Sequence, residues 1–442
     1  MRSITRTKRR AAVAAAAVLP LVLSACSAGS LGSSSGNDSA TTSIKLLVDN
    51  APDNLNAAKQ LAKDFEAKNP KIRVSVETRP GGTEGDNLIK TRLQTDSMSD
   101  VFSYNTGSLF QQIDPTKTLT PITQDSYVKS LEKSFLPQVT VGGQTYGVPF
   151  GSALGGGVLY NKKVYAKLGL TVPRTWADFI ANSEKIKAAG IAPVIQTYQD
   201  TWTSQLLVLG DFHNVSAAEP DFAEKFTANK AKFATDANAV KGFERVEQIH
   251  DLKLQNSDYA SATLVKGLQM LATGKGAQYP MLSTVIGAIK ASNPDELDDI
   301  GFFALPGENA AANGLTAWFP NAFYVPKSTT GDKLSAVKKF LAFAASPAGC
   351  TSQAKASTPT GPYLVKGCTL PSDVPTITKD VAAYFTSGAQ SPALEFLSPV
   401  KGPSLEQICV QVGSGITGAE DGAALYDKDT KKQAQQLGLP GW

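Results

Sequence analysis

The fold of this chain is decided by residues 144–179, which read QTYGVPFGSALGGGVLYNKKVYAKLGLTVPRTWADF. The stretch begins with β-prone residues, passes through Gly151 and the glycine run 155–157, and resumes as a strand before an amphipathic helix. Consecutive glycines can take backbone angles that are closed to other residues, and they allow a ligand or another backbone to approach closely. The pattern predicts an extended chain with a pivot, with Gly151, Gly155 and Gly156 as hinge residues. The alternative is an ordinary strand, loop and helix inside one α/β domain.

Four motifs in this stretch resemble a known family. They are Tyr146-Gly147-Val148-Pro149, Tyr160-Asn161-Lys162, Leu168-Gly169 and Pro173-Arg174-Thr175-Trp176-Ala177-Asp178-Phe179. In this order they resemble the interlobe crossing of the extracellular solute-binding proteins that serve ABC importers of sugars. The resemblance extends over residues 44–442. It implies an α/β, two-lobed periplasmic-binding-protein-like fold, in which each lobe is a sheet flanked by helices and a ligand cleft and hinge lie between the lobes.

The N-terminus has the pattern of an export signal. Residues 1–10 carry five basic and no acidic side chains, and residues 11–22 are mostly apolar, which predicts a signal peptide over residues 1–25. The apolar run is shorter than the ~20 residues of a membrane-spanning helix. Leu23-Ser24-Ala25-Cys26 resembles the bacterial lipobox, which implies that Cys26 is lipidated and anchors the protein at the outer face of the cell membrane. Cleavage elsewhere, with Cys26 incidental, is the alternative.

The charge balance and the length of the chain bear on its class. The charges give no support to a nucleic-acid-binding surface, and the length favours two lobes. The chain has 43 basic and 39 acidic residues, and removing the five basic residues of the leader leaves 38 against 39. The apparent basic character therefore belongs to the leader and gives no reason to expect nucleic-acid binding. Residues 26–42 are rich in Ser and Gly and are expected to form a lipid-anchored, flexible linker. About 400 residues follow, which favours two lobes over one.

The remaining chain alternates between strand and helix patterns. Strands are expected at 44–48, 72–76 and 100–104, with helices at 54–68 and 86–95, as in a doubly wound parallel sheet. With the crossing segment, this order predicts the lobe boundaries: lobe I comprises 43–149 plus about 320–375, and lobe II comprises 150–319 plus about 376–442.

Three cysteines remain for an oxidising compartment once Cys26 is assigned to lipid. One disulfide and one buried thiol is the simplest arrangement. Proximity along the chain favours Cys350 with Cys368, whereas Cys409 falls in a helical pattern. The sequence leaves the connectivity open.

Catalytic motifs give little support to an enzyme. His213 and His250 are the only histidines, and neither has the spacing of a metal site. The chain contains no Walker, dinucleotide-binding or GxSxG motif, so no metal, cofactor or catalytic residue is expected. A glycosidase would need only two suitably placed carboxylates, and the sequence does not exclude one.

A sugar site would combine flat aromatic surfaces with short polar side chains. Ligands of doubly wound sheets lie beyond the carboxyl ends of strands, which selects several polar residues, and Trp202 and Trp318 fall where aromatic surfaces would be useful. For both tryptophans, simple packing is the alternative. The complete predicted set is Asp49, Asn50, Asn105, Thr106, Phe150, Tyr198, Asp200, Trp202, Ser283, Trp318 and Tyr363.

The resemblance implies a function in solute capture. The expected protein is a monomeric substrate-binding lipoprotein that captures a mono- or oligosaccharide between its lobes and delivers it to the permease subunits of an ABC importer. Its expected partners are the sugar, the permease and, through Cys26, membrane lipid. A cell-surface glycoside-processing enzyme and a sensory binding lipoprotein without a transport role are the alternatives.

Overall fold

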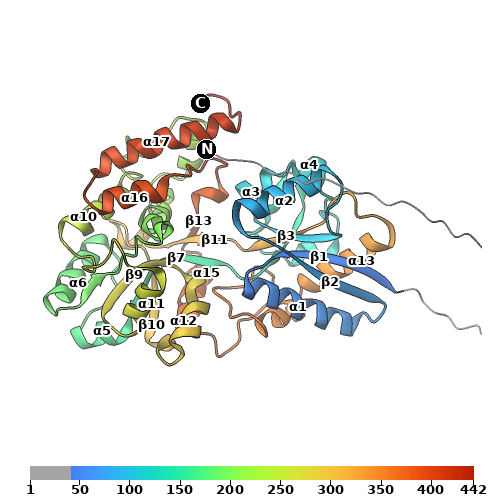
Figure 1. Cartoon of the computed structure of the whole chain (residues 1–442), viewed down its shortest axis with the longest axis horizontal. Helices are drawn as coiled ribbons and strands as arrows, with labels where there is room; N and C mark the ends of the chain where they lie inside the picture. The colour runs from blue at the N-terminus through green and yellow to red at the C-terminus, as the bar shows by residue number, and fades with distance from the viewer. Residues whose placement is uncertain (1–40) are drawn as a thin grey trace, which may run out of the picture. The chain divides into compact units, whose positions relative to one another are not determined.

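The computed structural model describes residues 41–442, which form one compact unit (Figure 1). The predicted signal peptide, the lipidation site Cys26 and nearly all of the linker 26–42 lie outside the described residues. Within residues 41–442, every helix is too short or too polar to cross a bilayer.

The first lobe is built on a five-stranded sheet with the order β2-β1-β3-β12-β6. Its strands are β1 (Thr42–Asp49), β2 (Ile72–Arg79), β3 (Val101–Tyr104), β6 (Gly147–Phe150) and β12 (Asn321–Tyr324). β1 runs parallel to β2 and β3, whereas β12 runs antiparallel to β3 and β6. The three strands expected before residue 105 and their parallel pairing are therefore confirmed.

Helices cover the first sheet because each has one apolar face. α1 (Pro52–Lys68) buries Leu61 and Phe65, and the ring of Phe65 meets that of Phe340 in α13 edge to face. The helices of this lobe are α1, α2 (Gly82–Gln94), α3 (Ser108–Gln111), α4 (Pro115–Thr118), α13 (Gly331–Ala344) and α14 (Pro347–Ala354). A small hairpin, β4 (Thr140–Val141) and β5 (Gln144–Thr145), precedes β6.

The second lobe is built on a six-stranded sheet in which β7 (Leu154–Asn161) is central. The order is β13-β11-β7-β9-β8, and β10 also pairs with β7. The other strands are β8 (Ala192–Val194), β9 (Gly276–Leu282), β10 (Ile300–Ala304), β11 (Leu315–Trp318) and β13 (Gln390–Pro392). The helices are α5 (Lys162–Leu168), α6 (Trp176–Ala188), α7 (Leu206–Gly210), α8 (Phe212–Ala218), α9 (Phe222–Thr227), α10 (Lys241–Asp251), α11 (Leu264–Ala272), α12 (Ile286–Ser292), α15 (Thr376–Ser387), α16 (Leu405–Gly413) and α17 (Ala419–Gln436).

The chain passes between the two sheets three times. It passes at residues 151–153 between β6 and β7, at 319–320 between β11 and β12, and at 355–375 between α14 and α15. β6 ends at Phe150, one residue beyond the boundary expected from the sequence. Figure 1 shows the two sheets on either side of these segments.

The glycine-rich segment differs from its predicted role. Gly151 lies in the first crossing with φ at 97°, a region that favours glycine. Gly155 and Gly156 instead lie inside β7, where they pair with neighbouring strands in extended backbone. Only one of the three predicted hinge glycines therefore occupies a crossing.

The cysteine prediction is confirmed. Cys350 and Cys368 form a disulfide that joins α14 to the third crossing. Cys409 is a buried free thiol in α16, and burial raises its pKa above the ordinary value.

Candidate functional site

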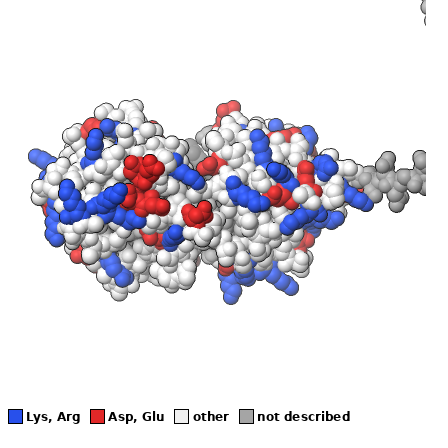
Figure 2. Space-filling model, turned by 90° about the horizontal axis from the view of Figure 1, so that it is seen from below, with Lys and Arg blue, Asp and Glu red and all other residues white. Residues whose placement is uncertain are grey.

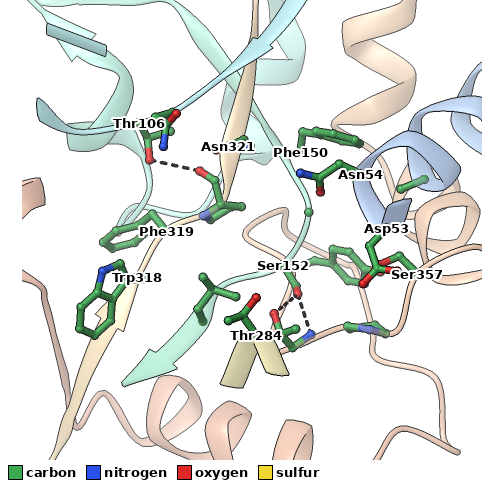
Figure 3. Close-up of a pocket in the computed structure, with 18 of the residues that line it drawn as sticks. Asp53, Asn54, Thr106, Phe150, Ser152, Thr284, Trp318, Phe319, Asn321 and Ser357 are labelled. Atoms are coloured by element: carbon green, nitrogen blue, oxygen red, sulfur yellow. Dashed lines mark hydrogen bonds between the residues drawn. The ribbon is translucent and has the colours of Figure 1, made fainter. Parts of the chain in front are cut away.

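A cavity of about 330 Å³ lies between the two sheets and is lined by residues of both lobes (Figure 3). The first lobe contributes the start of α1, the loop after β3, the end of β6 and the start of β12. The second lobe contributes the ends of β7 and β11, the residues before α12 and the short 3-10 helix η7 (Leu394–Phe396). All three crossings reach the cavity, so relative movement of the lobes would change its shape.

Five of the predicted ligand-contact residues line this cavity. They are Asn105, Thr106, Phe150, Trp318 and Tyr363. The Thr106 hydroxyl donates a hydrogen bond to the carbonyl of Pro320 at 3.1 Å, which ties the loop after β3 to the second crossing (Figure 3). These residues come from four separate segments, and the strand ends and crossings bring them together.

Two predicted residues lie near the start of the first helix, outside the lining. Asp49 is buried, and it accepts hydrogen bonds from the Asn54 side chain at 2.9 Å and from the backbone N–H of Ala51. Asn54 itself lines the cavity, so Asp49 positions a lining residue. Asn50 is exposed on the surface.

The residues after β8 also lie outside the lining, because β8 is the edge strand of the second sheet on the side away from β11. Tyr198 is buried against Tyr259. The carboxylate of Asp200 accepts a hydrogen bond from the backbone N–H of Leu264 and so holds the start of α11. Trp202 is half-buried against the apolar core around β9 and α11.

Ser283 is a supporting residue in the second lobe. It is fully buried, and its hydroxyl accepts a hydrogen bond from the Gly155 N–H at 2.9 Å. The next residue, Thr284, lines the cavity. The sequence therefore located the correct turn and selected the neighbour of the lining residue.

Aromatic side chains form much of the apolar wall. Trp318 lies against Gly156 of β7, and a Cβ atom on that glycine would meet the indole at 2.2 Å. The rings of Phe150 and Phe323 stack at 4.4 Å, and Phe319 meets Phe396 edge to face at 5.1 Å. Glycine in β7 thus leaves room for the indole to approach the strand closely.

Several polar lining residues were not predicted. They are Asp53, Asn54, Ser108, Ser152, Thr284, Asn321, Gln353, Ser357, Thr358, Thr360 and Glu395. The Ser152 hydroxyl accepts a hydrogen bond from the backbone N–H of Thr360 at 2.9 Å, and the side-chain amide oxygen of Gln353 accepts one from the backbone N–H of Gly151 at 2.8 Å. Ser152 lies in the first crossing and Asn321 directly follows the second, and these positions could have identified both residues from the sequence. Residues 353–360 and Glu395 reach the cavity only through long-range packing.

The charge of the lining is acidic. Asp53 and Glu395 are its only acidic side chains, and no Lys, Arg or His lines the cavity within residues 41–442. Over the same residues, no cluster of His, Cys, Asp or Glu has the composition of a metal site. On the face that Figure 2 shows, basic and acidic side chains are interspersed over both lobes. The aromatic, hydroxyl and amide side chains of the cavity suit a ligand with many hydroxyl groups and some apolar surface, and its two carboxylates disfavour an anionic ligand.

Comparison with known proteins identifies the family. The model of the bacterial extracellular solute-binding protein family matches residues 50–349. The multiple sugar-binding protein of Streptococcus mutans is 29% identical over 267 residues, which is 58% of this chain and 60% of that protein. The melibiose/raffinose/stachyose-binding protein MelE of Bacillus subtilis is 23% identical over 78% of this chain and 79% of its own length.

Solved structures share the fold. The apo form of RafE from Streptococcus pneumoniae matches 90% of this chain and all of its own chain, with a TM-score of 0.74 and 19% identity. RafE in complex with raffinose matches with a TM-score of 0.70 and 19% identity, over 88% of this chain and all of that one. The sheet order, the three crossings and the match over residues 50–349 together show that the chain belongs to the bacterial extracellular solute-binding protein family.

Proposed function

We propose that the protein is the substrate-binding lipoprotein of an ABC importer, which captures a mono- or oligosaccharide and delivers it to the membrane permease. The observation that carries the proposal is the interlobe cavity, whose wall combines aromatic rings with hydroxyl and amide side chains. Sugar rings offer apolar C–H faces and a fringe of hydroxyl groups, and this wall can contact both. Relatives that are named for the binding of several sugars support the same class of ligand.

Ligand capture would favour the closed arrangement of the lobes. At the rim of the cavity, the Lys290 ammonium donates a hydrogen bond to the Thr358 hydroxyl at 3.2 Å, and Asp53 of α1 lies opposite Gly287 of α12. Exposed polar contacts of this kind contribute about 0–1 kcal/mol each, so they hold the lobes weakly. A sugar that touches both lobes supplies the additional free energy and shifts the population toward closure. Gly151 is the proposed pivot.

The proposal also includes the membrane anchor and the lobe boundaries. Lipidation of Cys26 would tether a monomer to the extracellular face of the membrane, with residues 26–42 as the linker. Tethering raises the effective concentration of the loaded protein near the permease. The proposed lobes are 43–149 plus about 320–375 and 150–319 plus about 376–442, and the crossings at 151–153, 319–320 and 355–375 support this division.

A thermal-shift screen of the purified protein tests the proposal. The panel contains glucose, galactose, melibiose, raffinose, stachyose and N,N′-diacetylchitobiose, with amino acids and polyamines for comparison. A ligand that binds only the folded state stabilises it by about 2.7 kcal/mol at a hundredfold excess over Kd. A shift with sugars alone is expected. A shift with amino acids or polyamines alone would refute the sugar assignment.

Two further measurements separate the alternatives. A glycoside-processing enzyme would release product from the sugar that it binds, and chromatography after incubation would detect that product. A sensory lipoprotein would bind sugar, yet deletion of its gene would leave uptake of the radiolabelled sugar unchanged. Binding without product, together with loss of uptake, is the expected result.

A further inference from the structure

Glu395 occupies an unusual place in the cavity wall. It lies beside the lining residue Phe396 in η7 of the second lobe, well beyond Tyr363, the lining residue that precedes it in the chain. One carboxylate oxygen accepts a hydrogen bond from the indole N–H of Trp318, and the other forms an ion pair with Lys401. The Glu395 side chain is 23% exposed. A carboxylate is thus fixed beside the principal aromatic wall of the cavity.

The segment that carries Glu395 touches both lobes. The backbone N–H of Ala393 donates to the carbonyl of Ala317 in β11 at 2.9 Å, which fastens the segment beside Trp318. On its other side, a Cβ atom on Gly107 of the first lobe would lie 2.6 Å from the ring of Phe396. Glu395 is therefore held between β11 and the loop after β3, where a bound ligand must lie.

The hydrogen bonds that Glu395 already makes leave acceptor capacity unused. An ionised carboxylate has about four lone-pair sites, and Trp318 and Lys401 occupy one on each oxygen. Because the side chain lines the cavity and is partly exposed, the free sites can be reached by a ligand. The carboxylate can only accept, so its partner must be a donor such as a hydroxyl group. The ion pair with Lys401 offsets the charge, which suits a neutral donor.

We propose that Glu395 is a specificity-determining residue that accepts hydrogen bonds from hydroxyl groups of a neutral saccharide lying against Trp318, and that Lys401 is a positioning residue that fixes the carboxylate. This inference rests on the proposed function and extends it to the ligand class. A saccharide that lacks the contacted hydroxyl leaves the carboxylate unpaired, and one with its own carboxylate there is repelled. Both analogues bind more weakly than the parent sugar.

Titration calorimetry with deoxy sugars tests the assignment. The probes are the panel saccharide that binds most tightly, its monodeoxy derivatives and its uronic acid derivative. For wild-type protein, at least one monodeoxy derivative is expected to bind about 10- to 100-fold more weakly than the parent. In Glu395→Ala, the parent falls to the affinity of that derivative, while the derivative itself changes little, so discrimination between the two disappears.

Three further variants separate recognition from folding. Glu395→Gln keeps an acceptor for the Trp318 indole and removes the charge, so it tolerates the uronic acid derivative that wild-type protein rejects. Lys401→Gln weakens parent binding several-fold and retains part of the discrimination. Glu420→Gln is the matched control, because Glu420 is an exposed carboxylate at the start of α17, outside the cavity. The affinity of this variant for the saccharide stays at the wild-type value.

The outcomes are distinguishable. Equal loss of affinity for the parent and every deoxy derivative in Glu395→Ala would mean that the residue only supports the wall, and it would overturn the inference. Unchanged discrimination in both Glu395 variants would overturn it as well. If wild-type protein binds none of the panel saccharides, the proposed function fails, and the inference fails with it.

Discussion

The packing of Trp318 on Gly156 makes the substitution Gly156→Ala a sharp test of the cavity geometry. An added Cβ would lie 2.2 Å from one indole carbon and 2.9 Å and 3.1 Å from two others, whereas ordinary contacts begin at 3.4 Å. The ring would have to move by about 1.2 Å to restore contact. The ring has little freedom to do so, because Trp318 is 7% exposed and its indole N–H donates a hydrogen bond to the Glu395 carboxylate.

The cost can be estimated from this geometry. Overpacking of a well-ordered core costs about 1–3 kcal/mol, and replacing glycine by alanine inside a strand returns about 0.5–1 kcal/mol. The free energy of unfolding should therefore fall by up to about 2.5 kcal/mol. Displacement of the indole should also weaken saccharide binding at least tenfold, equivalent to about 1.4 kcal/mol. Urea unfolding and titration calorimetry measure the two effects separately.

Gly210 provides the matched control. It ends α7 beside the same strand, and the nearest atom to an added Cβ lies 3.8 Å away, so Gly210→Ala should keep wild-type affinity and stability within about 0.5 kcal/mol. Wild-type affinity in Gly156→Ala would refute the position assigned to the Trp318 ring. An equal loss of affinity in Gly210→Ala would show that the effect comes from general sensitivity of this lobe.

Three other expected outcomes follow from the same structure. Trp318→Ala should weaken saccharide binding at least tenfold in calorimetry, whereas Trp202→Ala should lower only stability, because Trp202 packs in the core outside the cavity. Replacing Cys350 and Cys368 by serine opens a loop with a sequence separation of 18 and should lower the free energy of unfolding by about 3 kcal/mol in urea. His213 is buried with both ring nitrogens hydrogen-bonded, and burial lowers its pKa from 6.5. Since the unfolded chain then takes up the proton first, stability should fall as the pH drops below about 6.5, and less so in His213→Gln.

Each of these outcomes has a result that contradicts it. Equal losses of saccharide affinity in Trp318→Ala and Trp202→Ala would contradict the assignment of Trp318 to the cavity wall and of Trp202 to the core. Urea midpoints that do not change on loss of the disulfide would mean that the unfolded chain gains little freedom. An identical pH profile in His213→Gln would assign the acid sensitivity to other groups.

Local patterns in the sequence were sufficient for the first three strands but not for the glycine run. Strand patterns at 44–48, 72–76 and 100–104 predicted β1, β2 and β3. These short apolar segments alternate along the chain with helical segments, and the helices cover the sheet. A run of glycines, by contrast, has the same appearance whether a chain needs unusual backbone angles or space for a neighbour. Gly151 serves the first purpose and Gly156 the second, and only the position of Trp318 distinguishes them.

The same limit separates Trp318 from Trp202. Trp202 lies beyond a strand pattern, whereas Trp318 lies next to the expected boundary at which the chain returns to the first lobe. β11 pairs with the central strand β7 and leads directly into a crossing, whereas β8 is an edge strand paired with β9. The order of strands in a sheet is set by long-range pairing, so the local pattern around each tryptophan could not reveal which one faces the cavity.

Connectivity explains which lining residues could be predicted. Phe150, Trp318 and Thr106 lie at or beside the crossings and strand ends, and a chain that links two sheets must place those positions between the lobes. Glu395 reaches the cavity because η7 is fastened to β11 and abuts Gly107, and these contacts depend on how the C-terminal segment packs. The crossings therefore determine where the cavity lies, while the packed segments determine which hydroxyl groups of a ligand it can contact. On this reasoning, substitution of Glu395 should alter ligand preference at small cost to folding, whereas substitutions at the crossings should alter closure for every ligand.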